Sequence, residues 1–253
     1  MGEILGILKD AFFQSDIVGR LIVILLGMAS VAAWSIMLYK GWQVMSLYKS
    51  CQEFIKEFDS TGSALALGYR LDPERGPLQS VCQAGFDALM ETLEPDGGSM
   101  GGRYGKFAAP RRALTFTELP RQLTEAEIEK VRASMTRRLN IQRMQMMDQM
   151  VILSTIVSLS PFCGLFGTVW GVMMTFVQLA AQQGKKADLG QLAPGVSGAL
   201  LTTVVGLLVA IPSVFGNNII MSIIDKTCAD MDTFVDDFLA SLRLERVKGQ
   251  QEG

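Results

Sequence analysis

The tract QMVILSTIVSLSPFCGLFGTVWGVMMTFVQLAAQQG, from Gln149 to Gly184, contains no Asp, Glu, Lys or Arg. A second uncharged tract, from Leu189 to Ile224, follows after only four residues. Uncharged apolar runs of this length are typical of transmembrane helices. Because the link at residues 182–190 is short, the two tracts are predicted to form an antiparallel helical hairpin, with transmembrane helices at residues 148–181 and 191–224.

Each tract is longer than a membrane span requires. As helices, runs of roughly 36 residues extend about 54 Å, whereas the hydrocarbon core is roughly 30 Å thick. We therefore expect the polar ends of both helices to continue outside the bilayer, on the side that holds most of the protein.

A third apolar segment, Leu21 to Tyr39, lies near the N-terminus between Arg20 and Lys40. It is long enough to cross a membrane as a helix. Acidic residues precede it where a cleaved signal peptide would be basic, and the apolar run is too long for one. A retained transmembrane helix is predicted at residues 17–42.

The composition excludes several classes of function. Of the 253 residues, 49% are hydrophobic and 19% charged; there is no histidine, and the net charge is −2. Without histidine there is no His-based metal site or Ser-His-Asp triad, and a near-neutral chain lacks the basic surface that nucleic acid requires. No cofactor, metal site or catalytic group is indicated, so an enzyme is not expected. The four cysteines have no CxxC spacing and are interpreted as reduced packing residues.

Lys and Arg residues are more frequent after the first span and before the second than in the N-terminal tail. By the positive-inside rule, the central region is cytoplasmic and the N-terminus periplasmic; Lys185 and Lys186 in the outer loop run against the rule. The transmembrane helices are expected at 17–42, 148–181 and 191–224. The expected periplasmic parts are a segment at 1–16 and a loop at 182–190. The expected cytoplasmic parts are a helical region at 43–147 and a C-terminal helix and tail at 225–253.

The region at 43–147 has the composition of amphipathic helices packed as a bundle. Apolar residues recur at helical spacing, as in Phe54 and Phe58 and again in Val81 and Leu89. Residues 94–110 are rich in Gly and Pro and are predicted to form a loop.

The sequence Thr124-Glu125-Ala126-Glu127 has the pattern of a helix-starting capping box. The helix that begins there is expected to continue unbroken into the second span.

Small residues recur every fourth position in the second and third segments. Such stripes let helix backbones approach closely in a membrane. The glycines assigned to helix packing are Gly164, Gly167, Gly171, Gly195, Gly198 and Gly206. Prolines expected to bend or locally open these helices are Pro161, Pro194 and Pro212.

Three threonines, Thr168, Thr202 and Thr203, lie among these glycines. They either line a polar pathway or bond the carbonyl one turn back in their own helix. A protein that moves protons or cations usually places an ionisable group at mid-membrane, and these spans have none there. Either the chain transports nothing, or a partner helix supplies the titratable group.

The motif SPFCGLFGTVWGVM (Ser160 to Met173), followed by LAPGVSGALLTTVVGLLVAIPSV (Leu192 to Val214), resembles the paired signature of the TolQ/ExbB/MotA proton-channel family. The first span and its lead-in also resemble the TolQ/ExbB branch, and three spans favour that branch over stators with four. The resemblance covers more than half of the chain.

The resemblance implies an all-α inner-membrane protein with three transmembrane helices, two of them very long and extending into a cytoplasmic helical bundle. It implies a homo-pentamer around the membrane helices of a TolR/ExbD-like single-span partner, whose Asp would face Thr168 and Thr203. Proton passage would then energise an outer-membrane process through a TolA- or TonB-like transducer, in Tol-Pal envelope maintenance or TonB-dependent import. Where the branch has a glutamate, this chain has Gly198, so no step of this chain can use that carboxylate.

Two alternatives remain open. The chain is a non-conducting membrane scaffold whose threonines and glycines serve packing only, or a motor subunit driven by sodium rather than protons.

Overall fold

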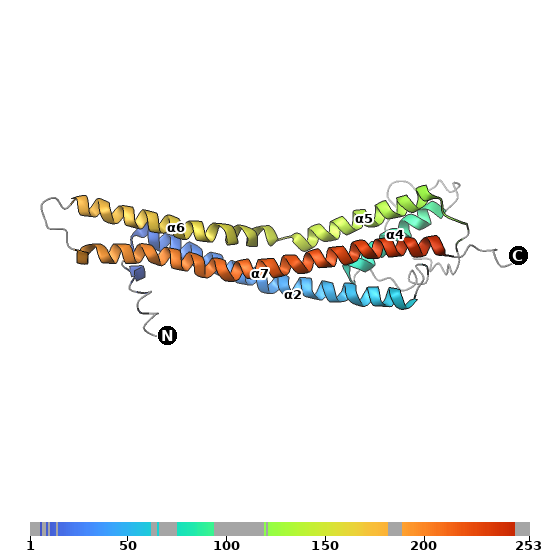
Figure 1. The fold of residues 1–253 in the computed structure, drawn as a ribbon, viewed down its shortest axis with the longest axis horizontal. Helices are drawn as coiled ribbons and strands as arrows, with labels where there is room; N and C mark the ends of the chain where they lie inside the picture. The colour runs from blue at the N-terminus through green and yellow to red at the C-terminus, as the bar shows by residue number, and fades with distance from the viewer. Residues whose placement is uncertain are drawn as a thin grey trace, which may run out of the picture. The chain divides into compact units, whose positions relative to one another are not determined.

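The computed structural model describes residues 15–61, 75–93, 121–181 and 189–245, together with residues 6, 9, 11–13, 65 and 119. These ranges contain the helices α2 (Ile17–Thr61), α4 (Pro77–Leu93), α5 (Glu125–Met147), α6 (Met150–Ala181) and α7 (Leu189–Leu244), and no β-strand (Figure 1). The predicted all-α class is confirmed. The loop predicted at 94–110, most of the N-terminal segment at 1–16 and most of the loop at 182–190 lie outside the described residues.

Three of these helices are long and apolar enough to span a membrane: α2, α6 and α7. Their lengths are 45, 32 and 56 residues. The helices that extend furthest beyond a span of about 20 residues are therefore α2 and α7. The lengths of the uncharged tracts suggested the second and third segments, so the third is long as expected and the first, not the second, is the other long helix. The first apolar segment gains its length from the amphipathic sequence that follows it.

The expectation of one unbroken helix through α5 and α6 is wrong. Helix α5 ends at Met147 and α6 begins at Met150. Between them Gln149 has a φ of 67°, a left-handed conformation that ends an α-helix. The side chain of Asp148 accepts a hydrogen bond of 3.0 Å from the Gln149 N–H, so a short polar side chain stabilises the break.

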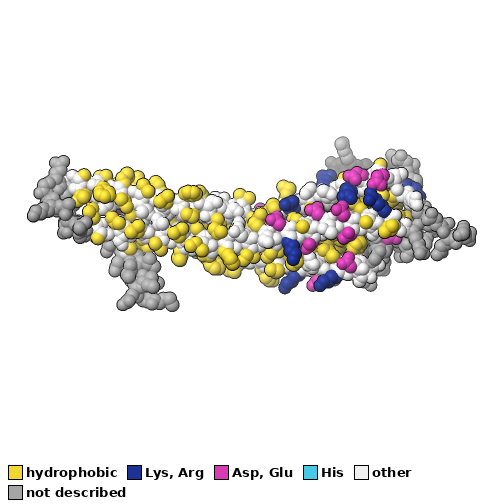
Figure 2. Space-filling view, viewed as in Figure 1, with side chains coloured by type: hydrophobic (Ala, Val, Ile, Leu, Met, Phe, Trp, Pro, Cys, Tyr) yellow, Lys and Arg dark blue, Asp and Glu magenta, His cyan; other side chains and the backbone are white. Residues whose placement is uncertain are grey.

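The chain divides into two compact units. The apolar unit consists of residues 1–42 and 148–221, and the charged unit of residues 43–147 and 222–253. The core of the apolar unit is small and is centred on Ile22, Leu26 and Val209. Many of its other large hydrophobic residues are exposed, and Figure 2 shows them over α6 and the part of α7 in this unit. An apolar exterior is what a bilayer requires of a membrane-spanning unit.

The charged unit has an aromatic core. The Phe234 ring lies 5.6 Å from that of Phe54 and 5.1 Å from that of Phe58, and the Phe86 ring lies 5.4 Å from that of Phe238. The predicted helical faces are confirmed, since Phe54, Phe58, Val81 and Leu89 are all buried. Lys, Arg, Asp and Glu gather on the outside of this unit (Figure 2), as expected for helices packed in water.

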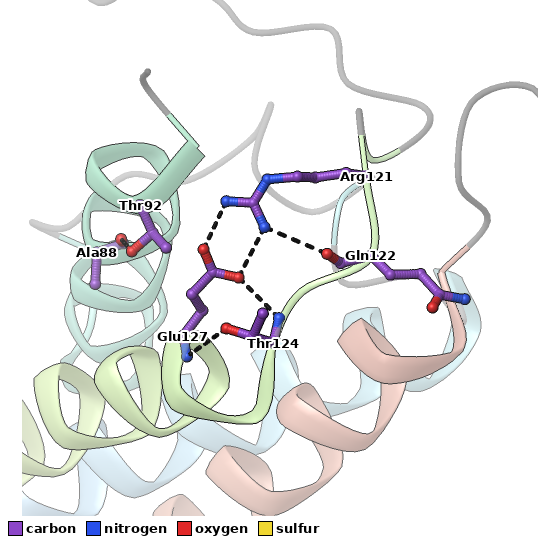
Figure 3. Close-up of polar contacts among 6 residues, drawn as sticks. All are labelled: Ala88, Thr92, Arg121, Gln122, Thr124 and Glu127. Atoms are coloured by element: carbon purple, nitrogen blue, oxygen red, sulfur yellow. Dashed lines mark hydrogen bonds and ion pairs between the residues drawn. The ribbon is translucent and has the colours of Figure 1, made fainter. Parts of the chain in front are cut away.

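The start of α5 has the predicted capping box (Figure 3). The Thr124 N–H donates to Glu127 Oε2 at 2.7 Å, and the Glu127 N–H donates to Thr124 Oγ1 at 3.4 Å. Arg121 adds two hydrogen bonds to the same carboxylate, at 2.8 and 2.6 Å. Together the Arg121 guanidinium and the Thr124 N–H lower the pKa of Glu127 to about 2.

All four cysteines are free thiols, as predicted from their spacing. Three of them are buried: Cys51, Cys82 and Cys228. In the charged unit, burial raises the pKa of Cys51 to about 12 and that of Cys82 still higher. These thiols therefore stay protonated at neutral pH and serve as packing groups.

Candidate functional site

The glycines at the contact between α6 and α7 let the two backbones approach closely. A Cβ added at Gly164 would lie 2.8 Å from the carbonyl oxygen of Thr202, and one at Gly206 would lie 2.7 Å from that of Ser160. Such distances leave no room for a side chain. Gly167, Gly171 and Gly195 also face the opposite helix of this pair.

Gly198 makes a different contact from the other five glycines. An added Cβ there would lie 2.6 Å from Ser15 Oγ and 2.9 Å from Ser15 Cα. The Ser15 hydroxyl donates to the Gly198 carbonyl at 3.2 Å, and Ser15 is only 6% exposed. The close neighbour of Gly198 is therefore the segment that precedes α2, and not helix α6.

The three threonines converge on one carbonyl group. The hydroxyl oxygens of Thr168, Thr202 and Thr203 lie within hydrogen-bonding distance of the Gly164 oxygen, at 3.2, 2.9 and 3.1 Å. Thr168 and Thr203 also hydrogen-bond each other through their hydroxyls, although they come from α6 and α7. We refer to these three residues as the threonine cluster.

Both readings of the threonines have some support in this geometry. Thr168 bonds Gly164 one turn back in its own helix, and Thr202 bonds Ala199 in the same way at 2.7 Å. Thr168 also reaches the Ala199 carbonyl across the helix pair at 3.3 Å. The cluster is therefore a shared polar network, since its bonds cross between helices as well as closing within them.

Solvent exposure divides the threonine cluster. Thr202 is fully enclosed, whereas Thr168 and Thr203 are half-buried. The paired hydroxyls thus belong to side chains that are only partly covered by the α6–α7 contact. The Thr202 hydroxyl cannot face an external partner and braces the helix pair from inside.

The prolines lie within continuous helices. Pro161 is in α6, and Pro194 and Pro212 are in α7. Neither helix ends at a proline. Helix continuity across proline is tolerated in membranes when neighbouring groups satisfy the freed carbonyls.

Sequence reasoning missed one polar contact in the apolar unit. Asp16 accepts a hydrogen bond of 2.9 Å from the Trp170 indole N–H and another of 2.8 Å from the Gly19 backbone N–H. The second contact is an N-cap of α2, which an Asp before an apolar helix signals in the sequence. The first links residues 154 positions apart, and no spacing rule indicates it.

The site offers hydroxyl and carbonyl oxygens but no titratable group of its own. Residues 150–181 and 189–224 contain no Asp, Glu, Lys or Arg. Within the described residues, no group of three His, Cys, Asp or Glu side chains is placed to hold a metal ion. The threonine cluster can solvate or relay a proton or cation, but a group that gains and loses a proton must come from elsewhere.

Comparison with known proteins identifies relatives over nearly the whole chain. The chain is 29% identical to the Tol-Pal system protein TolQ of Haemophilus influenzae, with 92% of each chain covered, and 31% identical to the Tol-Pal system protein TolQ of Pseudomonas aeruginosa, with 90% of this chain and 89% of the relative covered. It is also 29% identical to the biopolymer transport protein ExbB of Pseudomonas putida, over 94% of this chain and 62% of that protein.

The chain also matches the model of a protein family. Residues 108–233 match the MotA/TolQ/ExbB proton channel family, and this range contains α5, α6, the threonine cluster and most of α7. The likeness seen in the Gly- and Thr-rich motifs is thus supported by the chain as a whole. The chain belongs to the MotA/TolQ/ExbB proton channel family.

Proposed function

We propose that this chain is an inner-membrane channel and motor subunit that uses the proton motive force together with a TolR- or ExbD-like single-span partner. The observation that carries the proposal is the meeting of the Thr168 and Thr203 hydroxyls at a half-buried edge of the α6–α7 contact. A partner helix packed at this edge would face a pair of hydroxyls in an otherwise apolar surface.

The absence of charge in α6 and in the apolar part of α7 explains why a partner is needed. Proton transport usually requires an ionisable group near mid-membrane. A carboxylate on the partner helix would be that group, and the hydroxyls of Thr168 and Thr203 would solvate it. Each proton crossing a potential of 100 mV releases about 2.3 kcal/mol, so the motor would couple protons one at a time.

The names of the relatives suggest the process that is driven. The two TolQ proteins are Tol-Pal system components and match this chain over about nine-tenths of their own length, whereas the ExbB relative, a biopolymer transport protein, matches 94% of this chain over 62% of its own length. This supports a Tol-type role in envelope maintenance over TonB-dependent import. The subunit would assemble as a homo-pentamer and act through a TolA- or TonB-like transducer.

The proposed topology has a periplasmic N-terminus and a cytoplasmic C-terminus. The spans would be at 17–42, 148–181 and 191–224, with the segments at 43–147 and 225–253 in the cytoplasm. The Lys and Arg distribution supports this orientation, and the charged exterior of the unit at 43–147 and 222–253 suits an aqueous location (Figure 2). The subunit would act as a channel component and not as an enzyme.

Proton flux into vesicles that contain the chain and its partner tests the proposal. We expect Thr168→Val and Thr203→Val each to lower flux by about tenfold or more, because a preorganised hydroxyl is lost while the side-chain shape is kept. Thr168→Ser keeps the hydroxyl and should retain flux. Thr155→Val is the matched control, since among the described residues the Thr155 hydroxyl bonds the Val151 carbonyl of its own helix, at 2.8 Å, and no group of α7. Unchanged flux in both cluster variants would contradict the proposal.

The same assay separates the two alternatives. A non-conducting scaffold would give no flux with any variant, although the valine variants would still alter stability. A sodium-driven subunit would give flux under a sodium gradient and little under a proton gradient.

A further inference from the structure

The residues just before α2 are fastened to both helices of the α6–α7 hairpin. Ser15 donates to the Gly198 carbonyl of α7 at 3.2 Å, and Asp16 accepts from the Trp170 indole of α6 at 2.9 Å. We refer to Ser15, Asp16, Trp170 and Gly198 as the N-terminal anchor.

The N-terminal anchor is closely packed and buried at Ser15. Ser15 is 6% exposed, and its hydroxyl also donates to the Ala11 carbonyl at 2.8 Å. Gly198 has no Cβ, and one built there would lie 2.9 Å from the Ser15 Cα. The absence of a side chain at position 198 is therefore what lets the Ser15 backbone reach α7.

Asp16 uses both carboxylate oxygens. Oδ1 accepts from the Gly19 N–H at 2.8 Å and caps α2, while Oδ2 accepts from Trp170. One side chain thus joins the start of α2 to a fixed position on α6.

The anchor lies next to the threonine cluster along α7. Its acceptor on α7 is the Gly198 carbonyl, and the next carbonyl, that of Ala199, accepts from Thr168 at 3.3 Å and from Thr202 at 2.7 Å. On α6, Trp170 follows Thr168 by two residues. A shift of α7 against α6 at the anchor would therefore change the Thr168–Thr203 pairing.

We infer that Asp16 and Trp170 are positioning residues that, with Ser15 on Gly198, hold α6 and α7 in the register at which the Thr168 and Thr203 hydroxyls meet. This inference rests on the proposed function, because it assigns the anchor a role in ion flux through the threonine cluster. In this role Asp16 accepts hydrogen bonds.

Thermal unfolding of the full chain in detergent tests whether the hydrogen bond between Asp16 and Trp170 stabilises the fold. Asp16→Ser keeps an N-cap but has one oxygen in place of two, so it should lose the Trp170 contact, and Trp170→Phe removes the same contact from the other side. Each should lower Tm by about 2–4 °C, and the double variant should lower it no further than the larger single effect. Asp16→Asn keeps the cap through its one amide oxygen but turns an amide NH2 toward the Trp170 indole N–H, so it should lower Tm about as much as Asp16→Ser. Trp34→Phe, on the exposed face of α2, is the control for a Trp to Phe change.

Additive effects in the double variant would overturn the anchor, as would an unchanged Tm in Asp16→Asn. Both outcomes are independent of whether the chain conducts ions.

Proton flux of the complex with its partner tests the positioning role. Asp16→Ser, Asp16→Asn and Trp170→Phe should each lower flux by about tenfold, since small displacements of reacting groups have effects of this size or larger. Normal flux in Asp16→Ser, while Thr168→Val abolishes flux, would overturn the positioning role and leave the proposed function intact. Unchanged flux in the Thr168→Val and Thr203→Val variants would instead overturn the proposed function, and the Tm data would still decide whether the anchor exists.

Discussion

Replacing Gly164 by alanine should force α6 and α7 apart at the threonine cluster. The added Cβ would lie 2.8 Å from the Thr202 carbonyl oxygen and 3.0 Å from the Thr203 Cα. Carbon and oxygen atoms normally approach to about 3.3 Å, so the helices must separate by about half an ångström. Both opposing atoms belong to the α7 backbone, and no flexible side chain can move aside to relieve the overlap.

The cost of this separation follows from the same contacts. Overpacking costs about 1–3 kcal/mol. The hydrogen bonds from Thr202 and Thr203 to Gly164, now 2.9 and 3.1 Å, would be stretched, and interhelical hydrogen bonds in membranes are each worth about 0.6 kcal/mol. Alanine gains about 1 kcal/mol over glycine in helix propensity. The net destabilisation is about 1–3 kcal/mol, with a Tm lower by about 2–4 °C for each kcal/mol.

Thermal unfolding in detergent measures this effect, with Gly27→Ala as the control. Nothing lies within 4 Å of a Cβ added at Gly27, so that variant gains helix propensity without a clash and should be as stable as the parent or slightly more so. Equal Tm values for Gly164→Ala and Gly27→Ala would refute the close contact between α6 and α7.

Three further predictions concern the charged unit and the α5–α6 break. Cys51 and Cys82 should resist iodoacetamide in the native protein at pH 8 and react once it is unfolded, because their pKa values are raised to about 12 or higher; labelling of the native protein would contradict their burial. The pKa of Glu127 is about 2 in the folded protein, against an ordinary value of 4.5. The ionised Glu127 side chain therefore stabilises the fold at pH values above 4.5, and this stabilisation is lost as the pH falls toward 2. Arg121→Ala should therefore reduce the acid dependence of unfolding followed by circular dichroism, and an unchanged pH profile would argue against the ion pair. Gln149→Gly should leave Tm unchanged or raise it, since glycine adopts a positive φ at no steric cost, and a marked fall in Tm would show that the side chain matters.

The periodicity of the sequence predicted most of the fold. Uncharged tracts identified the three spans, and the spacing of Phe54, Phe58, Val81 and Leu89 identified buried faces of the charged unit. The Thr124–Glu127 capping box was readable because its signal is local. The helix break at Gln149 could not be predicted from the sequence, because glutamine has no strong preference for a positive φ and the surrounding residues all favour helix.

The candidate site was predictable in part. Four-residue spacing placed Gly164 and Thr168 on one face of their helix, but spacing alone could not show which helix each face would contact. Gly198 illustrates the limit, since it has the same four-residue spacing as Thr202 and Gly206 on α7 and yet faces Ser15. The contact between Asp16 and Trp170 is determined by how three helices pack, which no pattern along a single segment records.

The central claim is that this chain supplies a polar surface for ion transfer and that a partner helix supplies the titratable group. Proton flux measured in vesicles with a pH-sensitive dye tests it most directly, comparing the chain alone, the chain with its single-span partner, and the complex with the partner's membrane Asp changed to Asn. The account predicts flux only in the unmodified complex. Flux through the chain alone, or through the complex with the Asn variant, would contradict it.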